Sequence, residues 1–407
     1  MENPKIRFKG FTKDWEQRKF SELVTIERGG SPRPIDKFIT NDENGLNWVK
    51  IGDAPEQGNY ITQTAEKIRP EGLSKTREVH PGDLILSNSM SFGRPYIMAI
   101  DGCIHDGWLA IRDTKKNFDL KFLCTLLGTD GMLNQYKAMA AGSTVNNLNK
   151  ELVGGTTVAF PMVEEQIKIG DYFTTLDNLI TLHQRKCEQT KKLKKYMLQK
   201  MFPRNGAKVP EIRFDGFTYD WEQRKLGEIY GSIGNAFVGT ATPYYAEHGH
   251  FYLESNNVKD GQINHNAEIF INDEFYEKQK DKWLHTGDMV MVQSGHVGHA
   301  AVIPEELDNT AAHALIMFRN PKEEIEPYFL NYEYQTDKAK KQIENITTGN
   351  TIKHILASDM QEFVVDIPKY EEQKVIASYF CKLDHLITLH QRQTDFYKKP
   401  NFYFISS

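Results

Sequence analysis

The chain has few cysteines, no long apolar run and no excess of positive charge. Four cysteines occur in 407 residues, without Cys-x-x-Cys spacing, which predicts reduced, buried thiols and argues against a disulfide framework. No apolar stretch approaches the roughly 18 residues needed to cross a bilayer, and the first residues lack the apolar core of a signal peptide. We therefore expect a cytoplasmic protein with no membrane partner.

The composition is that of a globular protein. Hydrophobic residues make up 39% and charged residues 26%, and the formal net charge is −5. This balance counts against a chain coated in basic residues. It leaves room for local basic surfaces, because the charge that faces a nucleic acid sets the affinity.

Familiar catalytic motifs are also missing. The chain has no GxxxxGK[ST] phosphate loop, no HExxH zinc motif and no Asn/Asp-Pro-Pro-aromatic tetrapeptide. Four histidines, at His248, His250, His296 and His299, lie in Gly-rich stretches without cysteine partners, so we favour polar loops over a metal site. We expect no catalytic residue and no metal in this chain.

What the chain does contain is an internal repeat. Residues 6–19 read IRFKGFTKDWEQRK and residues 212–225 read IRFDGFTYDWEQRK, an offset of 212 − 6 = 206. A second phrase, LITLHQR, occurs at 179–185 and again at 386–392. Weaker matches, 80–89 with 285–294 and 141–161 with 348–368, keep the same order. Two copies are too few for a solenoid, so the repeat indicates a tandem pair of similar domains.

Each copy shows the pattern of an α+β domain. Short β-branched or aromatic runs bounded by turn residues predict strands, and apolar residues at helical spacing predict helices at 118–140 and 327–346. The strands are expected at 46–52, 83–89, 95–100 and 108–112, and at 250–255, 267–271, 288–294, 300–304 and 314–319. We predict a first domain at 1–160, a long spacer helix at 161–205, a second domain at 206–368 and a distal helix at 369–407.

The two long helices share a spacing of three and four residues that is typical of a coiled-coil seam. This spacing predicts that the helices pack antiparallel on each other, with a pseudo-two-fold axis; the alternative is that each lies on its own domain. A histidine pair on the seam favours a register-fixing contact over a metal or catalytic pair. Pro400 is expected to end the distal helix early. The predicted seam consists of Ile169, Phe173, Leu176, Ile180 and His183, and of Ile376, Phe380, Leu383, Ile387 and His390.

The paired WEQRK phrases, the Gly-Asp-apolar turns, the GST stretch and the EEQ helix with LITLHQR resemble the specificity subunit of type I restriction-modification systems. The resemblance implies two target-recognition domains that each read one half of a bipartite double-stranded DNA site. It implies helices that set the gap and dock methyltransferase subunits, with restriction subunits as further partners. S-adenosylmethionine, ATP and magnesium would belong to those partners, and no cofactor to this chain. The early end of the distal helix departs from the family pattern.

Polar and basic side chains in the Gly-rich turns are the candidate DNA contacts, because such groups bind phosphates and base edges. The alternative for any one of them is a surface turn without a ligand. Two other functions stay open, a self-sufficient nucleic-acid-modifying enzyme and a coiled-coil adaptor without DNA affinity. The candidates are Ser87, Asn88, Ser89, Arg94, Ser143, Thr144, Asn146, Asn147 and Lys150, and Gln293, Ser294, His296, His299, Thr348, Asn350, Thr351, Lys353 and His354.

Overall fold

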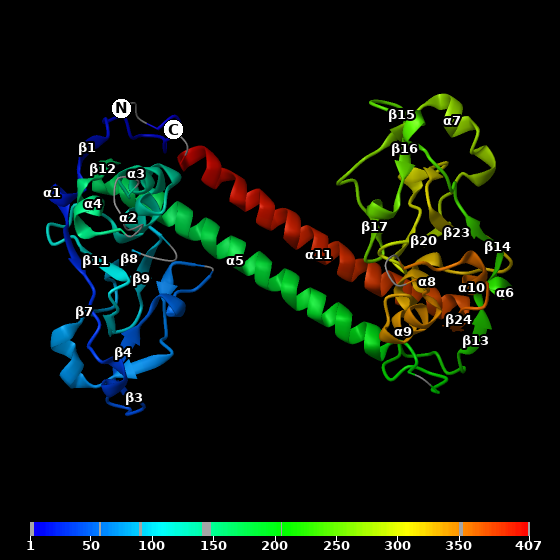
Figure 1. Cartoon of the computed structure of the whole chain (residues 1–407), viewed down its shortest axis with the longest axis horizontal. Helices are drawn as coiled ribbons and strands as arrows, with labels where there is room; N and C mark the ends of the chain where they lie inside the picture. The colour runs from blue at the N-terminus through cyan, green and yellow to red at the C-terminus, as the bar shows by residue number, and fades with distance from the viewer. Residues whose placement is uncertain are drawn as a thin grey trace. The chain divides into compact units, whose positions relative to one another are not determined.

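The computed structural model describes residues 4–56, 58–88, 92–140, 148–204, 206–349 and 353–405, with 399–405 described as backbone alone. The chain forms two compact units, one of Met1–Lys186 with His390–Ser407 and one of Cys187–Leu389 (Figure 1). Each unit contains one α+β domain and a part of both long helices. Within the described residues, none of the helices is both long enough and apolar enough to span a bilayer.

The first unit is built on two five-stranded sheets and a small strand pair. The pair joins β1 (Glu16–Lys19), from the repeated phrase, antiparallel to β12 (Thr157–Phe160). One sheet has the order β2-β11-β8-β9-β5 and the other β3-β6-β4-β10-β7. The strands of the first sheet are Thr25–Arg28, Trp108–Arg112, Leu84–Ser87, Pro95–Met98 and Tyr60–Ile61; those of the second are Ile39–Thr40, Glu66–Ile68, Leu46–Val49, Gly102–Ile104 and Arg77–Val79.

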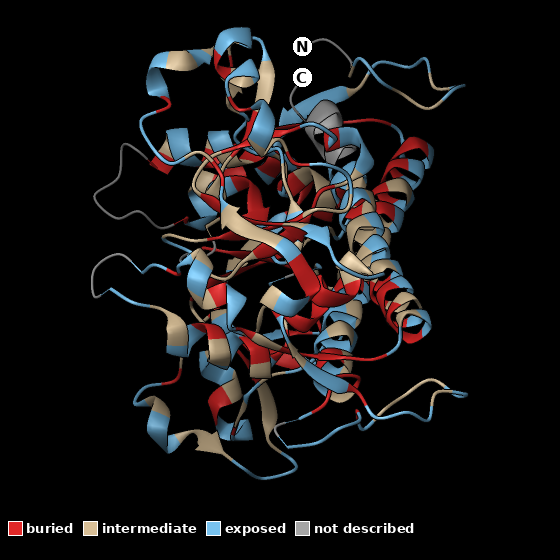
Figure 2. Ribbon diagram, turned by 90° about the vertical axis from the view of Figure 1, so that its right-hand side faces the viewer, coloured by how far each residue is buried: buried red, intermediate tan, exposed pale blue. Residues whose placement is uncertain are grey.

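Helices cover the first of these sheets. They are α1 (Phe20–Leu23), α2 (Leu120–Leu127), α3 (Asp130–Ala140) and α4 (Lys150–Gly155). Asp119 begins α2 by accepting a hydrogen bond from the Phe122 backbone N–H at 2.9 Å, as an N-cap does. The apolar side chains of α2 and α3 pack against β8 and β9, whose residues are all buried. Figure 2 colours the chain by burial, with buried residues in the interior strands and exposed residues in the outer loops.

The second unit repeats this plan with smaller sheets. Here β13 (Glu222–Lys225) pairs with β24 (Val364–Ile367). The four-stranded sheets have the orders β14-β23-β20-β21 and β15-β19-β16-β22, and β17 pairs with β18. Their strands are Tyr230–Asn235, Leu315–Pro321, Met289–Val292 and Ala300–Val302; Tyr245–Ala246, Phe270–Ile271, His250–Leu253 and Ala311–Ala312; and Val258–Lys259 with Gln262–Ile263. Its short helices are α6 (Leu226–Ile229), α7 (Asp273–Glu277), α8 (Pro327–Glu333), α9 (Asp337–Ile346) and α10 (Ala357–Gln361).

The predicted α+β class is confirmed, and every expected strand run contains an observed strand. The predicted helical stretches are also confirmed, each as two helices. In the first, Gly128 closes α2 before α3 begins; in the second, the N-cap Thr336 starts α9 after α8 has ended. Apolar spacing alone could not locate these breaks.

In each unit the first repeated phrase contacts the EEQ motif at the start of the long helix. The Arg7 guanidinium donates to both carboxylate oxygens of Glu165 at 2.9 and 2.6 Å, and Arg213 does the same to Glu372 at 2.7 and 2.7 Å. Both glutamates are buried, with side chains 1% and 2% exposed. Bidentate pairs of this kind are strong and directional. The repeated residues therefore stabilise the domain fold.

The next residue of each EEQ motif makes the same two hydrogen bonds to the backbone of its own domain. Gln166 accepts a hydrogen bond from the Asp119 N–H and donates to the Pro161 carbonyl, both at 2.9 Å. Gln373 accepts from the Glu326 N–H and donates to the Pro368 carbonyl, also at 2.9 Å. Because buried backbone groups need partners, an identical residue at both places gives both domains the same geometry.

The long helices are α5 (Val163–Lys200) and α11 (Tyr370–Ile405). In the first unit, the His183 and His390 Nδ1 atoms lie 3.1 Å apart, and Tyr397 packs against the core that includes Leu176. In the second unit, Cys187 contacts the Ile387 carbonyl at 3.9 Å, and Lys194 Nζ lies 2.7 Å from the Asp384 carboxylate. Rising numbers on one helix meet falling numbers on the other, so the predicted antiparallel pairing is confirmed within each unit.

Two expectations for these helices need correction. The first three seam residues of each helix, Ile169, Phe173 and Leu176 in α5 and Ile376, Phe380 and Leu383 in α11, pack into the core of the adjoining domain. For this part of each helix the alternative arrangement, a helix lying on its own domain, is the observed one. Pro400 does not end α11, which continues to Ile405. One missing N–H donor within the last two turns removes a single hydrogen bond, and the helix tolerates it.

Candidate nucleic-acid interface

The turn after β8 carries the first group of predicted DNA contacts. Ser87 and Asn88 are 0% and 3% exposed, because β8 is covered on both faces. The Ser87 Oγ accepts a hydrogen bond from the Arg94 backbone N–H at 3.2 Å, and Asn88 Nδ2 donates to the Asp106 carbonyl at 2.9 Å. These two side chains stabilise the turn from inside and are not exposed at its surface.

Two basic residues of the first unit, Arg94 and Lys150, differ in how accessible their charged groups are. The Arg94 guanidinium donates to the carbonyls of Glu56 and Gly58 at 3.0 and 3.1 Å and lies 5.0 Å from the centroid of the Tyr96 ring. It therefore joins two loops. Lys150 is exposed at the start of α4, where its Nζ lies 3.8 Å from the Glu151 carboxylate. Of the two, Lys150 has the cationic group that a phosphate could reach.

The matching turn of the second unit, after β20, is more open. Gln293 and Ser294 are half-buried and His296 is exposed. A Cβ placed on Gly295 would meet no atom within 4 Å. Polar side chains at this turn can therefore approach a ligand.

The structure brings this turn together with the second predicted segment. The Ile355 N–H donates to the Gln293 carbonyl at 2.9 Å, and the Gly295 N–H donates to the Lys353 carbonyl at 3.2 Å. Thr348 and His354 exchange backbone hydrogen bonds at 2.9 and 2.8 Å. Gln293, Ser294, His296, Thr348, Lys353 and His354 thus form one polar surface, hereafter the second-unit loop surface.

The first unit has the equivalent link, where the Leu148 N–H donates to the Asn88 carbonyl at 3.0 Å. Most of the loop that precedes it lies outside the described residues. The predicted contacts Ser89, Ser143, Thr144, Asn146, Asn147, Asn350 and Thr351 all fall in such segments.

Glycines in these turns pack against helices. Gly93 and Gly298 each lie next to a residue of a helix. Both have positive φ, +76° and +86°, and a Cβ would lie 2.8 Å from the Tyr136 ring or 2.7 Å from Ile343 Cγ2. Only glycine fits such a turn without displacing the helix behind it.

His299 is tied into its own domain. Its ring is half-buried, and Nδ1 accepts a hydrogen bond from the Asp260 backbone N–H at 3.2 Å. Burial lowers the pKa of this histidine, so the neutral ring is favoured. His250, another of the Gly-rich histidines, stacks on Tyr276 with ring centroids 3.6 Å apart. Among the described residues, no cluster of three or more His, Cys, Asp or Glu side chains could hold a metal ion.

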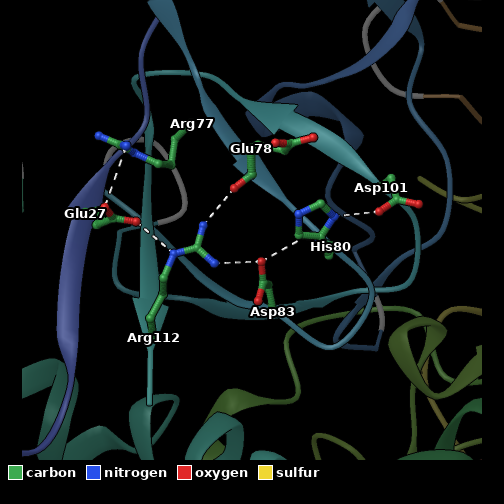
Figure 3. Close-up of polar contacts among 7 residues, drawn as sticks. All are labelled: Glu27, Arg77, Glu78, His80, Asp83, Asp101 and Arg112. Carbon is green, nitrogen blue, oxygen red and sulfur yellow. Dashed lines mark hydrogen bonds and ion pairs between the residues drawn. The ribbon is translucent and has the colours of Figure 1, made fainter. Parts of the chain in front are cut away.

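A charged network surrounds the Gly-Asp turn of the first unit (Figure 3). Arg112 donates to Glu27 at 2.7 Å, to Asp83 at 3.0 Å and to the Glu78 carbonyl at 2.7 Å. Asp83 also accepts from the His80 backbone N–H at 2.9 Å. Burial alone would lower the pKa of Arg112, but Glu27 and Asp83 raise it. The Glu27 and Asp83 carboxylates thus already have donors, and the network stabilises the turn.

The second unit keeps part of this network. Asp288 accepts from the His285 backbone N–H at 2.8 Å, as Asp83 does from His80. Arg319 donates instead to the carbonyls of Asp281 and Trp283 at 3.0 and 3.3 Å. Burial raises the pKa of Asp288. The turn geometry is therefore shared, while the side chains around it differ.

Comparison with known proteins accounts for the duplication. A family model described as "Type I restriction modification DNA specificity domain" matches residues 12–192 and 219–395, which is most of the chain. The chain belongs to this family. It is a type I specificity subunit with two target-recognition domains.

Curated relatives of this specificity subunit carry matching names. The putative type I restriction enzyme MjaX specificity subunit of Methanocaldococcus jannaschii is 24% identical over 411 residues, which covers 94% of this chain and 89% of the relative. The EcoBI specificity subunit of Escherichia coli is 20% identical over 377 residues, covering 89% and 77%. The crystal structure of the type I S subunit from M. genitalium aligns over 99% of this chain and 98% of that chain, with a TM-score of 0.65 and 13% identity, and shows the shared fold.

Sequence reasoning missed the two buried Arg–Glu pairs of this specificity subunit. Arg7 and Glu165 are 158 residues apart in the chain, so no local pattern links them. A signal was nevertheless present, because both residues recur at matching places in the second copy, as Arg213 and Glu372. Residues that repeat together are candidates for contact even when they are far apart in sequence.

Proposed function

We propose that each domain of this specificity subunit reads one half of a bipartite double-stranded DNA site, and that the chain itself performs no catalysis. The observation that carries the proposal is the combination of an identical frame with different loops. The Arg–Glu and Gln contacts match closely between the units, whereas the turns after β8 and β20 carry different side chains. Such a chain can present two recognition surfaces on one scaffold.

The second-unit loop surface supports DNA contact in that domain. It combines a lysine and two histidines with amide and hydroxyl groups on adjoining backbone segments. Lysine binds phosphates, and Gln, Ser, Thr and His side chains can bond to base edges. We infer that the counterpart in the first domain includes Lys150.

We assign methylation and cleavage to other subunits. Methyltransferase subunits that use S-adenosylmethionine, and restriction subunits that use ATP and magnesium, would assemble with this chain in the cytoplasm. One solved neighbour, described as the structural basis of complex assembly of the type I system, aligns over 97% of this chain with a TM-score of 0.52. The long helices are the natural docking elements, and they would set the gap between the half-sites.

The test is methylation of a random DNA library by this chain together with the methyltransferase subunit of its own system. Sequencing of modified sites should return two defined half-sites at a fixed spacing. The chain alone, incubated with S-adenosylmethionine and the same library, should modify nothing. Methylation by the chain alone would contradict the assignment of catalysis to partners, and modification without a two-part motif would contradict the two-reader proposal.

A further inference from the structure

The first domain contains a groove outside the predicted turns. It has a volume of about 1140 Å³ and lies between the loop at residues 31–36, the end of β4 and the residues that follow β10. Its polar lining includes Ser31, Arg33, Lys50, Glu66, His105 and Asp106. Figure 1 shows β4 in the sheet on the side of the unit away from α2 and α3.

The groove contains both hydrogen-bond donors and acceptors. Two cations, Arg33 and Lys50, face three carboxylates, Asp36, Glu66 and Asp106. A surface that cradles phosphates would carry an excess of positive charge. Base edges in the major groove carry no net charge and present donors and acceptors side by side, so a mixed lining suits them better.

The ionic groups of the groove remain accessible. The Arg33 side chain is 84% exposed, and its guanidinium lies 3.8 Å from the Asp106 carboxylate. Lys50 Nζ lies 2.7 Å from the Glu66 carboxylate, with both side chains more than a third exposed. Ion pairs this exposed contribute little to stability, so a ligand can replace them at small cost.

The groove is joined to the turn after β8. The Asn88 side chain donates to the Asp106 carbonyl at 2.9 Å, and the Asn88 N–H donates to the Gly107 carbonyl at 2.9 Å. The buried turn thus fixes one wall of the groove. Asn88 can thus contribute to recognition through this wall, although its own side chain is buried.

The second domain repeats the backbone at this place and changes the side chains. The Lys50 N–H is capped by Asp53 at 2.7 Å, and the Glu254 N–H by Asn257 at 3.0 Å. In both domains a histidine follows the parallel strand pair: the His105 N–H donates to the Val49 carbonyl at 3.1 Å, and the His313 N–H to the Leu253 carbonyl at 2.9 Å.

The matched positions therefore carry opposite charges on the same scaffold, Lys50 in one domain and Glu254 in the other. Glu254 is held by Tyr245 Oη at 2.8 Å and by His313 Nδ1 at 3.2 Å. Two domains with one architecture must differ somewhere if they read different sequences. A position with identical backbone contacts and opposite charge meets that requirement.

We propose that this groove binds base edges of the first half-site, that Lys50 determines specificity there, and that Glu254 has the same role in the second domain. The inference rests on the proposed function. A lysine ammonium donates to guanine O6 and N7, and a glutamate accepts from the cytosine amino group, so the two positions favour different bases. Arg33, at the edge of the groove, contacts a neighbouring phosphate.

The experiment repeats the library methylation with single variants of the complex. Lys50→Met keeps the side-chain stem and removes the donor. Lys67→Met is the matched control, because Lys67 is the next residue along β6 from Glu66, its Nζ donates to the Glu43 carbonyl, and it does not line the groove. Glu254→Gln tests the second domain. Thermal unfolding of each variant checks that it folds.

Lys50→Met should reduce the preference at one base position of the first half-site about tenfold to a hundredfold and leave the second half-site unchanged. Glu254→Gln should do the reverse, and Lys67→Met should change neither. A Lys50→Met protein that folds but keeps the wild-type motif, or that loses methylation equally on all sequences, overturns the inference. If the wild-type complex itself shows no two-part motif, the proposed function fails instead.

Discussion

The buried pair Arg213–Glu372 permits a quantitative prediction. Glu372→Ala removes both carboxylate contacts at 2.7 Å and leaves Arg213 bonded to the Tyr219 carbonyl at 2.7 Å. Removing one partner of a buried pair costs about 3–5 kcal/mol, because the other charge stays desolvated. The Arg213 side chain is 15% exposed and can recover some hydration, so we expect about 3 kcal/mol.

For a unit of this size, about 3 kcal/mol corresponds to a decrease of roughly 6–12 °C in the unfolding midpoint. Calorimetry or circular dichroism of the purified chain can measure it. Glu371→Ala is the matched control, since Glu371 is the preceding residue with a side chain 74% exposed and paired with Lys374 at 2.8 Å. We expect that variant to stay within about 0.5 kcal/mol of the wild type.

A second variant separates charge from packing. Arg213→Met combined with Glu372→Leu removes both charges and should recover much of the lost stability, because apolar replacements of buried pairs are often neutral. Equal midpoints for Glu372→Ala and Glu371→Ala would refute the idea that the repeated pair stabilises the domain. Glu165→Ala tests the same contact in the first unit.

Three further predictions concern ionisation and backbone geometry. Burial, and then the neighbouring charges of His390 and Lys186, lower the pKa of His183 below 6.5, so the free energy of unfolding should fall as the pH drops from about 7.5 to about 5.5. His183→Gln should weaken this pH dependence in unfolding measurements, and an unchanged dependence on pH would contradict the prediction. Burial raises the pKa of Glu333 well above 4.5, so this group lowers the free energy of unfolding as the pH rises above that value. Glu333→Gln should make the free energy of unfolding depend less on pH in this range, and a stronger dependence would count against the prediction. Gly295→Ala should lower the free energy of unfolding by about 1 kcal/mol because of the positive φ. Gly298→Ala should lower it by about 1–3 kcal/mol more, because the added Cβ would meet Ile343. Equal losses for the two variants in denaturant unfolding would show that the helix carrying Ile343 moves to make room.

Much of the architecture was predictable because the chain contains two copies of one sequence pattern, which can be compared with each other. The recurrence of DWEQRK and LITLHQR indicated two similar domains, and strand and helix patterns in each copy placed most elements. Both long helices were predicted from their spacing. What the spacing could not reveal was the packing partner, because Phe173 and Phe380 show the same periodicity whether they face another helix or a domain core.

The candidate site was harder to predict for a related reason. Ser87 and Asn88 are polar residues after an apolar strand, which is typical of an exposed turn, yet both are buried because the strand is central in its sheet. Burial at that point depends on β11 and β9, which come later in the chain. The groove at Lys50 likewise joins segments from residues 31 to 106, so no single stretch of sequence describes it.

The residues at the end of α5 and just after it limit where the chain can be divided into two fragments. Leu198, Met201 and Phe202 are encoded by the first repeat but belong to the core of the second unit, where Phe202 lies 5.4 Å from the Phe329 ring and 6.0 Å from the Trp221 ring. In return, Tyr397 of the second repeat packs on the core of the first unit. If the chain were cut between Phe202 and the second IRF phrase, each fragment would thus lack residues that belong to the core of its own unit. The two fragments should be poorly soluble apart and should complement each other when produced together, in the manner of a split protein.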